Sequence, residues 1–201
     1  MQKQHFPREN ARRKLPHYLE AETVDILIDE ASSTSMMAAN LLLTMWRAGL
    51  RVTEAVNLQA RDLRLSGDYP QIHVRDGKGQ KERYIPAHPE LRDALRRHCR
   101  YTRVRGTDPI FVNERSGKKA SRDTGYQWVM RALSRAVQAG RLPPGTRATP
   151  HTFRHSAARH WLANGVPINV VQRWLGHESL DVTLIYLALV PDLSHTMDHI
   201  P

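Results

Sequence analysis

Residues 35–58 read SMMAANLLLTMWRAGLRVTEAVNL, and this stretch predicts the centre of the core. Its first half is apolar on nearly all sides of a helix, which predicts a buried central helix over residues 35–48. Gly49 can end that helix, and a short second helix then turns Ala55, Val56 and Leu58 inward. Arg51 lies between the two, where a plain surface arginine has little reason to be. We interpret Glu54, in the first turn, as a helix-start acid or a partner that orients Arg51.

The remaining pattern predicts a mostly helical chain with one small antiparallel sheet, an α+β fold. QIHV at 71–74 and ERYI at 82–85 are typical of strands, and RDGKGQK between them contains residues typical of a turn. DLRL at 62–65 is a candidate third strand. Helical spacing predicts further helices over residues 21–31, 88–104, 121–139, 150–163, 167–175 and 179–187.

The composition points to a polyanionic partner. Lys plus Arg is 30 and Asp plus Glu is 20, a net charge of 30 − 20 = +10, with a sequence pI of about 10.2. Such a basic balance favours nucleic acid. Cys99 is the single cysteine, which excludes an intrachain disulfide and a cysteine zinc site and fits a reducing cytoplasm. We expect neither a signal peptide nor a membrane span, because the apolar run at 36–46 is shorter than the roughly 20 residues that a span needs.

Residues 150–160, PHTFRHSAARH, gather histidines and arginines on one predicted helix. His151 and His155 have the spacing of two zinc ligands, but a third ligand and the glutamate of an HExxH motif are missing. A metal site is therefore the weaker alternative. His151 and Arg154 are candidates for a phosphate site, while His155 and His160 are interpreted as structural or solvent-facing.

Further candidates lie elsewhere: Lys78 at the hairpin tip, His177 after a glycine-ended helix, and Tyr186. Phosphoryl transfer without a metal needs rigid cations for the non-bridging oxygens, which arginine supplies. It also needs a nucleophile such as a tyrosine hydroxyl, and a lysine or histidine to protonate the leaving oxygen. Arg51, Lys78, His151, Arg154, His177 and Tyr186 together form such a set.

The motifs GLRVTE, GKGQKER, HTFRH and LGH, with Tyr186 nine residues after His177, occur in one order. The chain thereby resembles the catalytic domain of the tyrosine recombinases, the phage integrase family, over about residues 20–190. Type IB topoisomerases share the chemistry, but the spacing and the LGH motif favour the recombinases. The resemblance implies the tyrosine-recombinase catalytic fold and a site-specific recombinase of the integrase, invertase or resolvase type, belonging to a mobile element.

The resemblance also implies a role for each residue. Arg51 and Arg154 would hold the non-bridging oxygens, with His177 as a third donor. Lys78 would protonate the leaving 5′ oxygen, and His151 would act as acid or base near Tyr186. Tyr186 would attack phosphorus and leave a 3′-phosphotyrosine. The phosphotyrosine keeps the bond energy, so neither ATP nor a metal or other cofactor is implied.

The domain organisation follows from the resemblance. We expect a basic N-terminal arm at 1–20, the catalytic domain at 21–190 and a tail at 191–201. We expect the N-terminal DNA-clamping domain of most relatives to be absent, either naturally, as in the stand-alone fimbrial DNA invertases that are similar in size, or because the sequence is truncated or comes from a degraded element. As in relatives, the apolar C-terminal residues could pack onto a neighbouring protomer or fold back on their own domain; these residues are Leu187, Leu189, Val190, Leu193 and Met197.

The expected partner is double-stranded DNA at specific, inverted-repeat sites, bound by a dimer or tetramer. We expect the protein to act in the cytoplasm at the nucleoid and to be encoded by a bacterium, a phage or a plasmid. Candidate DNA-backbone contacts are Lys81, Arg83, Lys118, Lys119 and Arg122, whereas the arginines of 92–105 could be only a solvated helix face. Two alternatives remain open: a non-catalytic DNA-binding regulator with this fold, and a relaxing topoisomerase of type IB.

Overall fold

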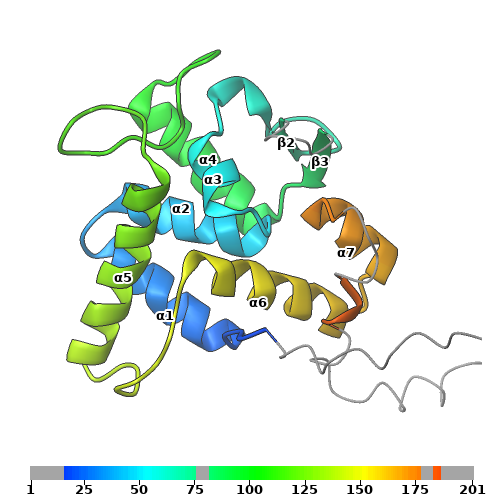
Figure 1. The fold of residues 1–201 in the computed structure, drawn as a ribbon. Helices are drawn as coiled ribbons and strands as arrows, with labels where there is room; N and C mark the ends of the chain where they lie inside the picture. The colour runs from blue at the N-terminus through cyan, green and yellow to red at the C-terminus, as the bar shows by residue number, and fades with distance from the viewer. Residues whose placement is uncertain (1–15, 76–81, 178–182, 187–201) are drawn as a thin grey trace, which may run out of the picture.

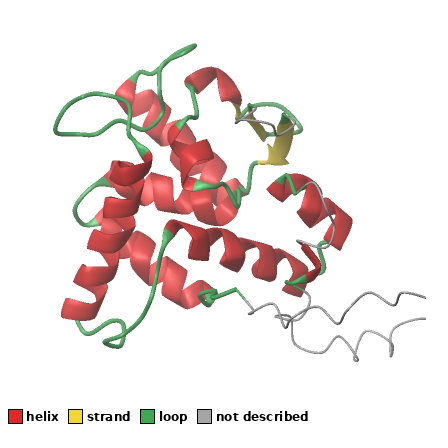
Figure 2. Cartoon of the chain, in the orientation of Figure 1, coloured by secondary structure: helices red, strands yellow, loops and turns green. Residues whose placement is uncertain are grey.

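A computed structural model describes residues 16–75, 82–177 and 183–186. Helices dominate it and a small sheet lies at one end (Figures 1 and 2). The chain order is α1 (Ala21–Ser32), α2 (Met36–Arg47), α3 (Val52–Val56), a 3-10 turn (Ala60–Asp62), β1 (Leu63–Arg64), β2 (Gln71–Val74), β3 (Arg83–Pro86), α4 (Pro89–Thr102), α5 (Arg122–Gln138), α6 (Pro150–Ala163) and α7 (Ile168–Leu175). The predicted α+β fold is confirmed.

Helix α2 is the centre of the core, as its apolar sequence predicted. Its residues from Met37 to Trp46 are all buried, and α2 contacts α1, α3, α4, α5 and α6. Ser35 caps its start by accepting a hydrogen bond from the Ala38 amide at 3.0 Å. Gly49 then takes a positive φ of 60°, and a Cβ there would lie 2.6 Å from the Trp161 ring of α6. The turn after α2 therefore needs glycine, and it sets Arg51 at the start of α3.

The sheet is antiparallel in the order β1-β2-β3, so the candidate third strand is confirmed. Ile72 pairs with Leu63 on one side and with Ile85 on the other. Arg83 and Ile85 share the buried face of β3. The turn between β2 and β3, with Lys78 and Lys81, lies outside the described residues.

Helix α6 runs along the core beside α2 and meets α7 near its C-terminal end (Figure 1). Residues 16–20 do not behave as a free arm: the buried Leu19 donates its amide to Ser156 of α6 at 2.7 Å, and Glu20 pairs with Arg159 at 2.9 Å. The expected arm at 1–20 is described only over these five residues, which contact α6. The predicted helix over 179–187 is described only at 183–186, and the tail at 191–201 not at all. Within the described ranges, no helix combines the length and apolar character that crossing a membrane requires.

Candidate active site

Glu54 is the shared counter-ion of three arginines from three elements. Its Oε1 accepts from Arg51 Nη1 at 3.0 Å and its Oε2 from Arg83 Nη2 at 2.8 Å, while Arg154 Nη1 lies 3.6 Å from Oε2. Burial raises the pKa of Glu54, but the hydrogen bond and charge of Arg83, with Arg154 and the Arg51 amide, outweigh burial and leave that pKa below its usual value. The carboxylate thus stays ionised, in contact with Arg51 as expected.

Arg154 is held from both sides by backbone carbonyls. It lies in the second turn of α6, whose start carries Pro150 and is capped by Thr149. Its guanidinium donates to Gly49 O at 2.9 Å and to Leu175 O at 2.5 Å, and the residue is 4% exposed. Burial lowers the pKa of Arg154 to about 10, which leaves it charged at neutral pH. A planar cation is therefore fixed where α2, α6 and α7 meet.

Arg83 is not free for the DNA-backbone contact that the sequence suggested. It is buried, and besides Glu54 it donates from Nε to Trp174 O at 2.7 Å. Gly176, with φ of 68°, closes α7 over it, and a Cβ at Gly176 would lie 3.0 Å from Arg83 Nη1. The sequence of β3 carried a signal for this placement. Arg83 is two residues before the apolar Ile85, and residues two apart in a strand lie on the same face.

His177 and Tyr186 lie on the α7 side of this cluster. Tyr186 is 3% exposed, and its ring stacks on His177 with centroids 6.3 Å apart. His177 Nδ1 shares a hydrogen bond with Thr183 Oγ1 at 3.0 Å. Burial, with the charges of Arg154, Arg51 and Arg83, lowers the pKa of His177 to about 4, so the ring is neutral at pH 7. Burial raises the pKa of Tyr186, while Arg154 and Arg51 act in the opposite direction. The tyrosine hydroxyl and the arginines therefore share one electrostatic site.

His155, rather than His151, contacts the tyrosine hydroxyl. The distance from His155 Nδ1 to Tyr186 Oη is 2.8 Å, whereas His151 is exposed on the first turn of α6. The interpretation of His155 as structural or solvent-facing did not include this contact with Tyr186, and the role of His151 as an acid or base near Tyr186 stays a prediction. The sequence signal was the position of His155 directly after Arg154, on a helix whose neighbours Phe153 and Ala157 are core residues.

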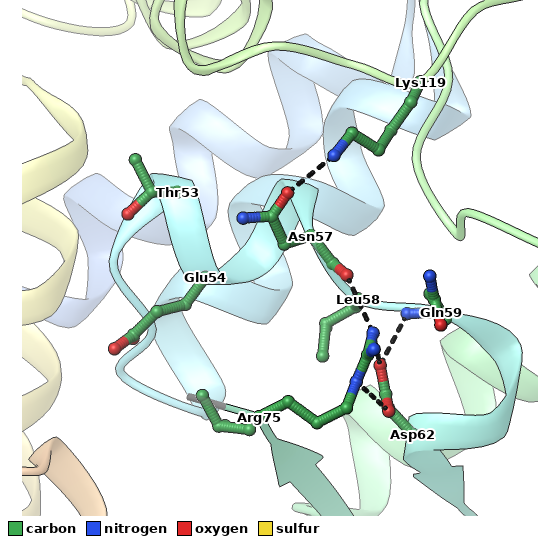
Figure 3. Close-up of a pocket in the computed structure, with 9 residues that line it drawn as sticks. Thr53, Glu54, Asn57, Leu58, Gln59, Asp62, Arg75 and Lys119 are labelled. Atoms are coloured by element: carbon green, nitrogen blue, oxygen red, sulfur yellow. Dashed lines mark hydrogen bonds and ion pairs between the residues drawn. The ribbon is translucent and has the colours of Figure 1, made fainter. Parts of the chain in front are cut away.

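A polar pocket of about 300 Å³ lies between α3 and the base of the hairpin (Figure 3). At its rim Lys119 donates to Asn57 Oδ1 at 2.8 Å, and Arg75 pairs with Asp62 at 2.8 Å (Figure 3). Lys118, Lys119 and Arg122 are all exposed, with Arg122 opening α5. These three candidate DNA contacts therefore remain accessible.

The described part of the chain holds no ligand set for the zinc alternative. Across residues 16–75, 82–177 and 183–186, no group of three or more His, Cys, Asp or Glu side chains is placed to hold a metal ion. His155 Nδ1 is instead engaged with a tyrosine. The arrangement has the cations and the hydroxyl that phosphoryl transfer needs, with Lys78 and Lys81 outside the described residues.

Comparison with solved structures defines the class of the fold. A crystal structure of XerA recombinase matches with a TM-score of 0.73 at 28% identity, covering 94% of this chain and 67% of that one. A structure of XerH site-specific recombinase bound to a palindromic difH substrate matches with a TM-score of 0.74 at 23% identity, over 96% of this chain and 55% of that one. The fold is the catalytic fold of the tyrosine recombinases.

Sequence comparison gives the family. The model of the phage integrase family matches residues 17–191, so this chain belongs to that family. Tyrosine recombinase XerA of Thermococcus kodakarensis is 36% identical over 174 residues, which are 87% of this chain and 58% of that protein. Tyrosine recombinase XerD of Oceanobacillus iheyensis is 33% identical over 182 residues, again 87% of this chain and 58% of that protein. The chain thus spans little more than half the length of these relatives, which come from an archaeon and a bacterium.

Proposed function

We propose that this chain is the catalytic part of a site-specific tyrosine recombinase that cuts and rejoins DNA through a 3′-phosphotyrosine. The observation that carries the proposal is the buried Tyr186 hydroxyl: burial raises its pKa, and the charges of Arg154 and Arg51 act in the opposite direction. A tyrosine placed beside two arginines on a phage integrase fold suits attack on a phosphodiester.

Each residue of the proposed site has its own role in the reaction. Arg51 and Arg154 neutralise the non-bridging oxygens, and His177 adds a neutral donor that gains a proton more readily once a phosphate lies beside it. Lys78 protonates the 5′ oxygen as it leaves. His151, exposed on α6, is accessible to the DNA. Rejoining reverses each step with a 5′ hydroxyl of another strand, so the sequence of steps conserves bond energy without ATP.

The partner in this proposal is double-stranded DNA with inverted-repeat sites. Related recombinases bind DNA at specific sites, as the XerH structure with its palindromic substrate illustrates. A net charge of +10 and the exposed Lys118, Lys119 and Arg122 support a DNA-facing surface. We further propose a dimer or tetramer on DNA through the C-terminal tail, acting in the cytoplasm at the nucleoid.

Covalent capture tests the proposal and finds the target sequence in the same experiment. A pool of nicked duplexes with randomised inverted-repeat arms is incubated with the protein and denatured, and DNA that stays attached to protein is sequenced. Wild type is expected to enrich one site, and Tyr186→Phe is expected to give no adduct. An adduct with Tyr186→Phe, or binding without any adduct from wild type, would contradict the proposal and favour a non-catalytic regulator.

A second assay separates recombination from relaxation. A supercoiled plasmid carries two copies of the captured site, and its products are resolved on a gel. Inverted or excised products identify a recombinase. Relaxed circles alone identify the topoisomerase alternative.

A further inference from the structure

We propose that His155 is a further catalytic residue: its Nδ1 takes the proton from the Tyr186 hydroxyl as that oxygen attacks phosphorus. This inference rests on the proposed function, in which Tyr186 is the nucleophile. It assigns the proton acceptor to a residue outside the six-residue set that the sequence motifs defined.

The geometry carries the first step. His155 Nδ1 and Tyr186 Oη are 2.8 Å apart, within the range for direct proton transfer along a hydrogen bond. The ring centroids lie 5.6 Å apart at 43°, so the rings are tilted against each other rather than stacked. His155 follows Arg154 directly on α6, and Arg154 is fixed by Gly49 O and Leu175 O. The same turn of helix therefore positions the phosphate cation and the proton acceptor.

Other bases near the hydroxyl are already engaged or face away. His177 Nδ1 shares a hydrogen bond with Thr183 Oγ1 at 3.0 Å, and its ring is stacked with the Tyr186 ring at a centroid distance of 6.3 Å. Both Glu54 oxygens accept hydrogen bonds from arginines. His151 is exposed on the preceding turn. Within the described residues, His155 is the base whose ring nitrogen meets the hydroxyl.

The surroundings of His155 keep it able to accept a proton. Burial lowers its pKa to about 4, and the charges of His151, Arg154 and His17 act in the same direction. His177 and Tyr186 face it from the α7 side. A neutral imidazole with its proton on Nε2 has a free lone pair on Nδ1. Because Tyr186 keeps its proton when buried, activation requires such a neighbour.

A bound phosphate supplies the condition for transfer. Imidazolium beside Arg154 is unfavourable, because positive charges already surround the ring. The negative charge of a scissile phosphate offsets those charges and favours the protonated ring. Proton loss from Tyr186 is thereby coupled to the arrival of DNA, which protects the nucleophile until a substrate is present.

The step balances in atoms and charge. The Tyr186 Oη–phosphorus bond forms while the bond from phosphorus to the 5′ oxygen breaks. The phenolic proton moves to His155 Nδ1, and a different proton, from Lys78 in the proposed mechanism, goes to the 5′ oxygen. In rejoining, His155 returns its proton to Tyr186 as the phosphotyrosine breaks.

The test compares His155→Ala and His155→Asn with His160→Ala, a control on the same helix that is also half-buried. Single-turnover cleavage of the captured nicked duplex is measured across pH, with and without added imidazole, alongside thermal unfolding and DNA affinity. Asn can keep a hydrogen bond to the hydroxyl but cannot take its proton. We expect both His155 variants to be slowed on the order of 10²-fold or more, because general-base contributions have that size. We also expect imidazole to rescue His155→Ala and His160→Ala to keep the wild-type pH profile.

Several outcomes would overturn the inference. If His155→Asn cleaves like wild type, His155 only positions the tyrosine. The same follows if His155→Ala is slow but keeps the wild-type pH profile and ignores imidazole. If wild type forms no adduct, or Tyr186→Phe forms one, the proposed function fails and the inference falls with it. A wild-type adduct that Tyr186→Phe abolishes leaves the function standing whatever the His155 variants do.

Discussion

Helices α4 and α6 both have 14 residues and both carry arginine, yet they use it in opposite ways. Helix α4 buries Leu91, Ala94, Leu95 and His98 along one stripe, and its arginines are half-buried or exposed. Arg92 pairs with its neighbour Asp93 at 2.9 Å. Helix α6 is buried on several sides, and Arg154 bonds to Gly49, 105 residues away in the sequence.

Arginine carries specific chemistry where it is buried and fully partnered, and much less where it is exposed. An exposed ion pair such as that of Arg92 contributes little, because water screens it and both side chains lose freedom. Buried charge must be partnered throughout, since an uncompensated ion in the interior costs several kcal/mol. The fold provides such partners around Arg154. Mutation and pH can test this contrast between buried and exposed arginine.

The largest effect is expected at Arg154. Arg154→Lys keeps the charge but loses the fork that bonds Gly49 O and Leu175 O together. We expect cleavage of the captured site to fall by about 10³-fold, since removing one preorganised transition-state donor has roughly that effect. The measurement is the single-turnover adduct rate. Arg97→Lys on the exposed face of α4 is the control and should keep the wild-type rate; equal losses would abolish the contrast.

Removal of the shared counter-ion comes next. Glu54→Gln leaves Arg51, Arg83 and Arg154 without their carboxylate, and we expect the free energy of unfolding to fall by about 3 kcal/mol. Glu90→Gln breaks the exposed pair with Arg47 and should cost about 0.5 kcal/mol. Urea unfolding measures both. A cost at Glu54 no greater than that at Glu90 would show that the cluster is not stabilised as a unit.

The free energy of unfolding should fall as the pH is lowered, because of His155 and His177. The folded pKa values of His155 and His177 are about 4, below the ordinary 6.5. Between these values the unfolded chain binds protons that the folded chain does not, so stability rises with pH across this window. Each group adds at most about 1.4 kcal/mol per pH unit to the slope. Urea unfolding at several pH values should show a flatter slope for the double variant His155→Asn, His177→Asn; an unchanged slope would contradict the assignment.

The smallest effect concerns DNA affinity at the surface. Lys118→Ala with Lys119→Ala should lower the salt dependence of binding by about one phosphate contact for each lysine that touches DNA. Arg97→Ala with Arg100→Ala on α4 should leave that dependence unchanged. The readout is the slope of log affinity against log salt concentration. A larger change from the α4 pair than from the lysine pair would place the DNA-binding surface on α4.

Local patterns predicted the fold because each element carries its own signal. The apolar run of α2, the turn chemistry at 75–81 and the proline that opens α6 each act within a few residues. The bounds of α5 and α6 differ from the prediction by no more than a residue at either end. The contact of residues 16–20 with α6 was not predicted, because Ser156, the partner of Leu19, lies 137 residues away in the sequence.

The site was predictable in kind but not in detail. Motif order brought out Arg51, Arg154, His177 and Tyr186, which the structure places in one electrostatic cluster. Which histidine meets the tyrosine depends on the rotation of α6 against residues 183–186, and no local pattern encodes that rotation. The burial of Arg83 was not predicted, because a basic residue in a hairpin usually faces solvent. Its partner, the carboxylate of Glu54, lies 29 residues earlier in the sequence.

The sharing of Glu54 has a consequence for the energetics of the proposed reaction. Three guanidinium groups around one carboxylate leave a surplus of two positive charges, since 3 − 1 = 2. A phosphodiester at rest carries one negative charge, but the five-coordinate phosphorane formed by a phenolate carries about two. The surplus therefore matches the transition state better than the substrate. By neutralising one arginine of three, a single acidic side chain sets the net positive charge of the site, and with it the negative charge that the site stabilises best.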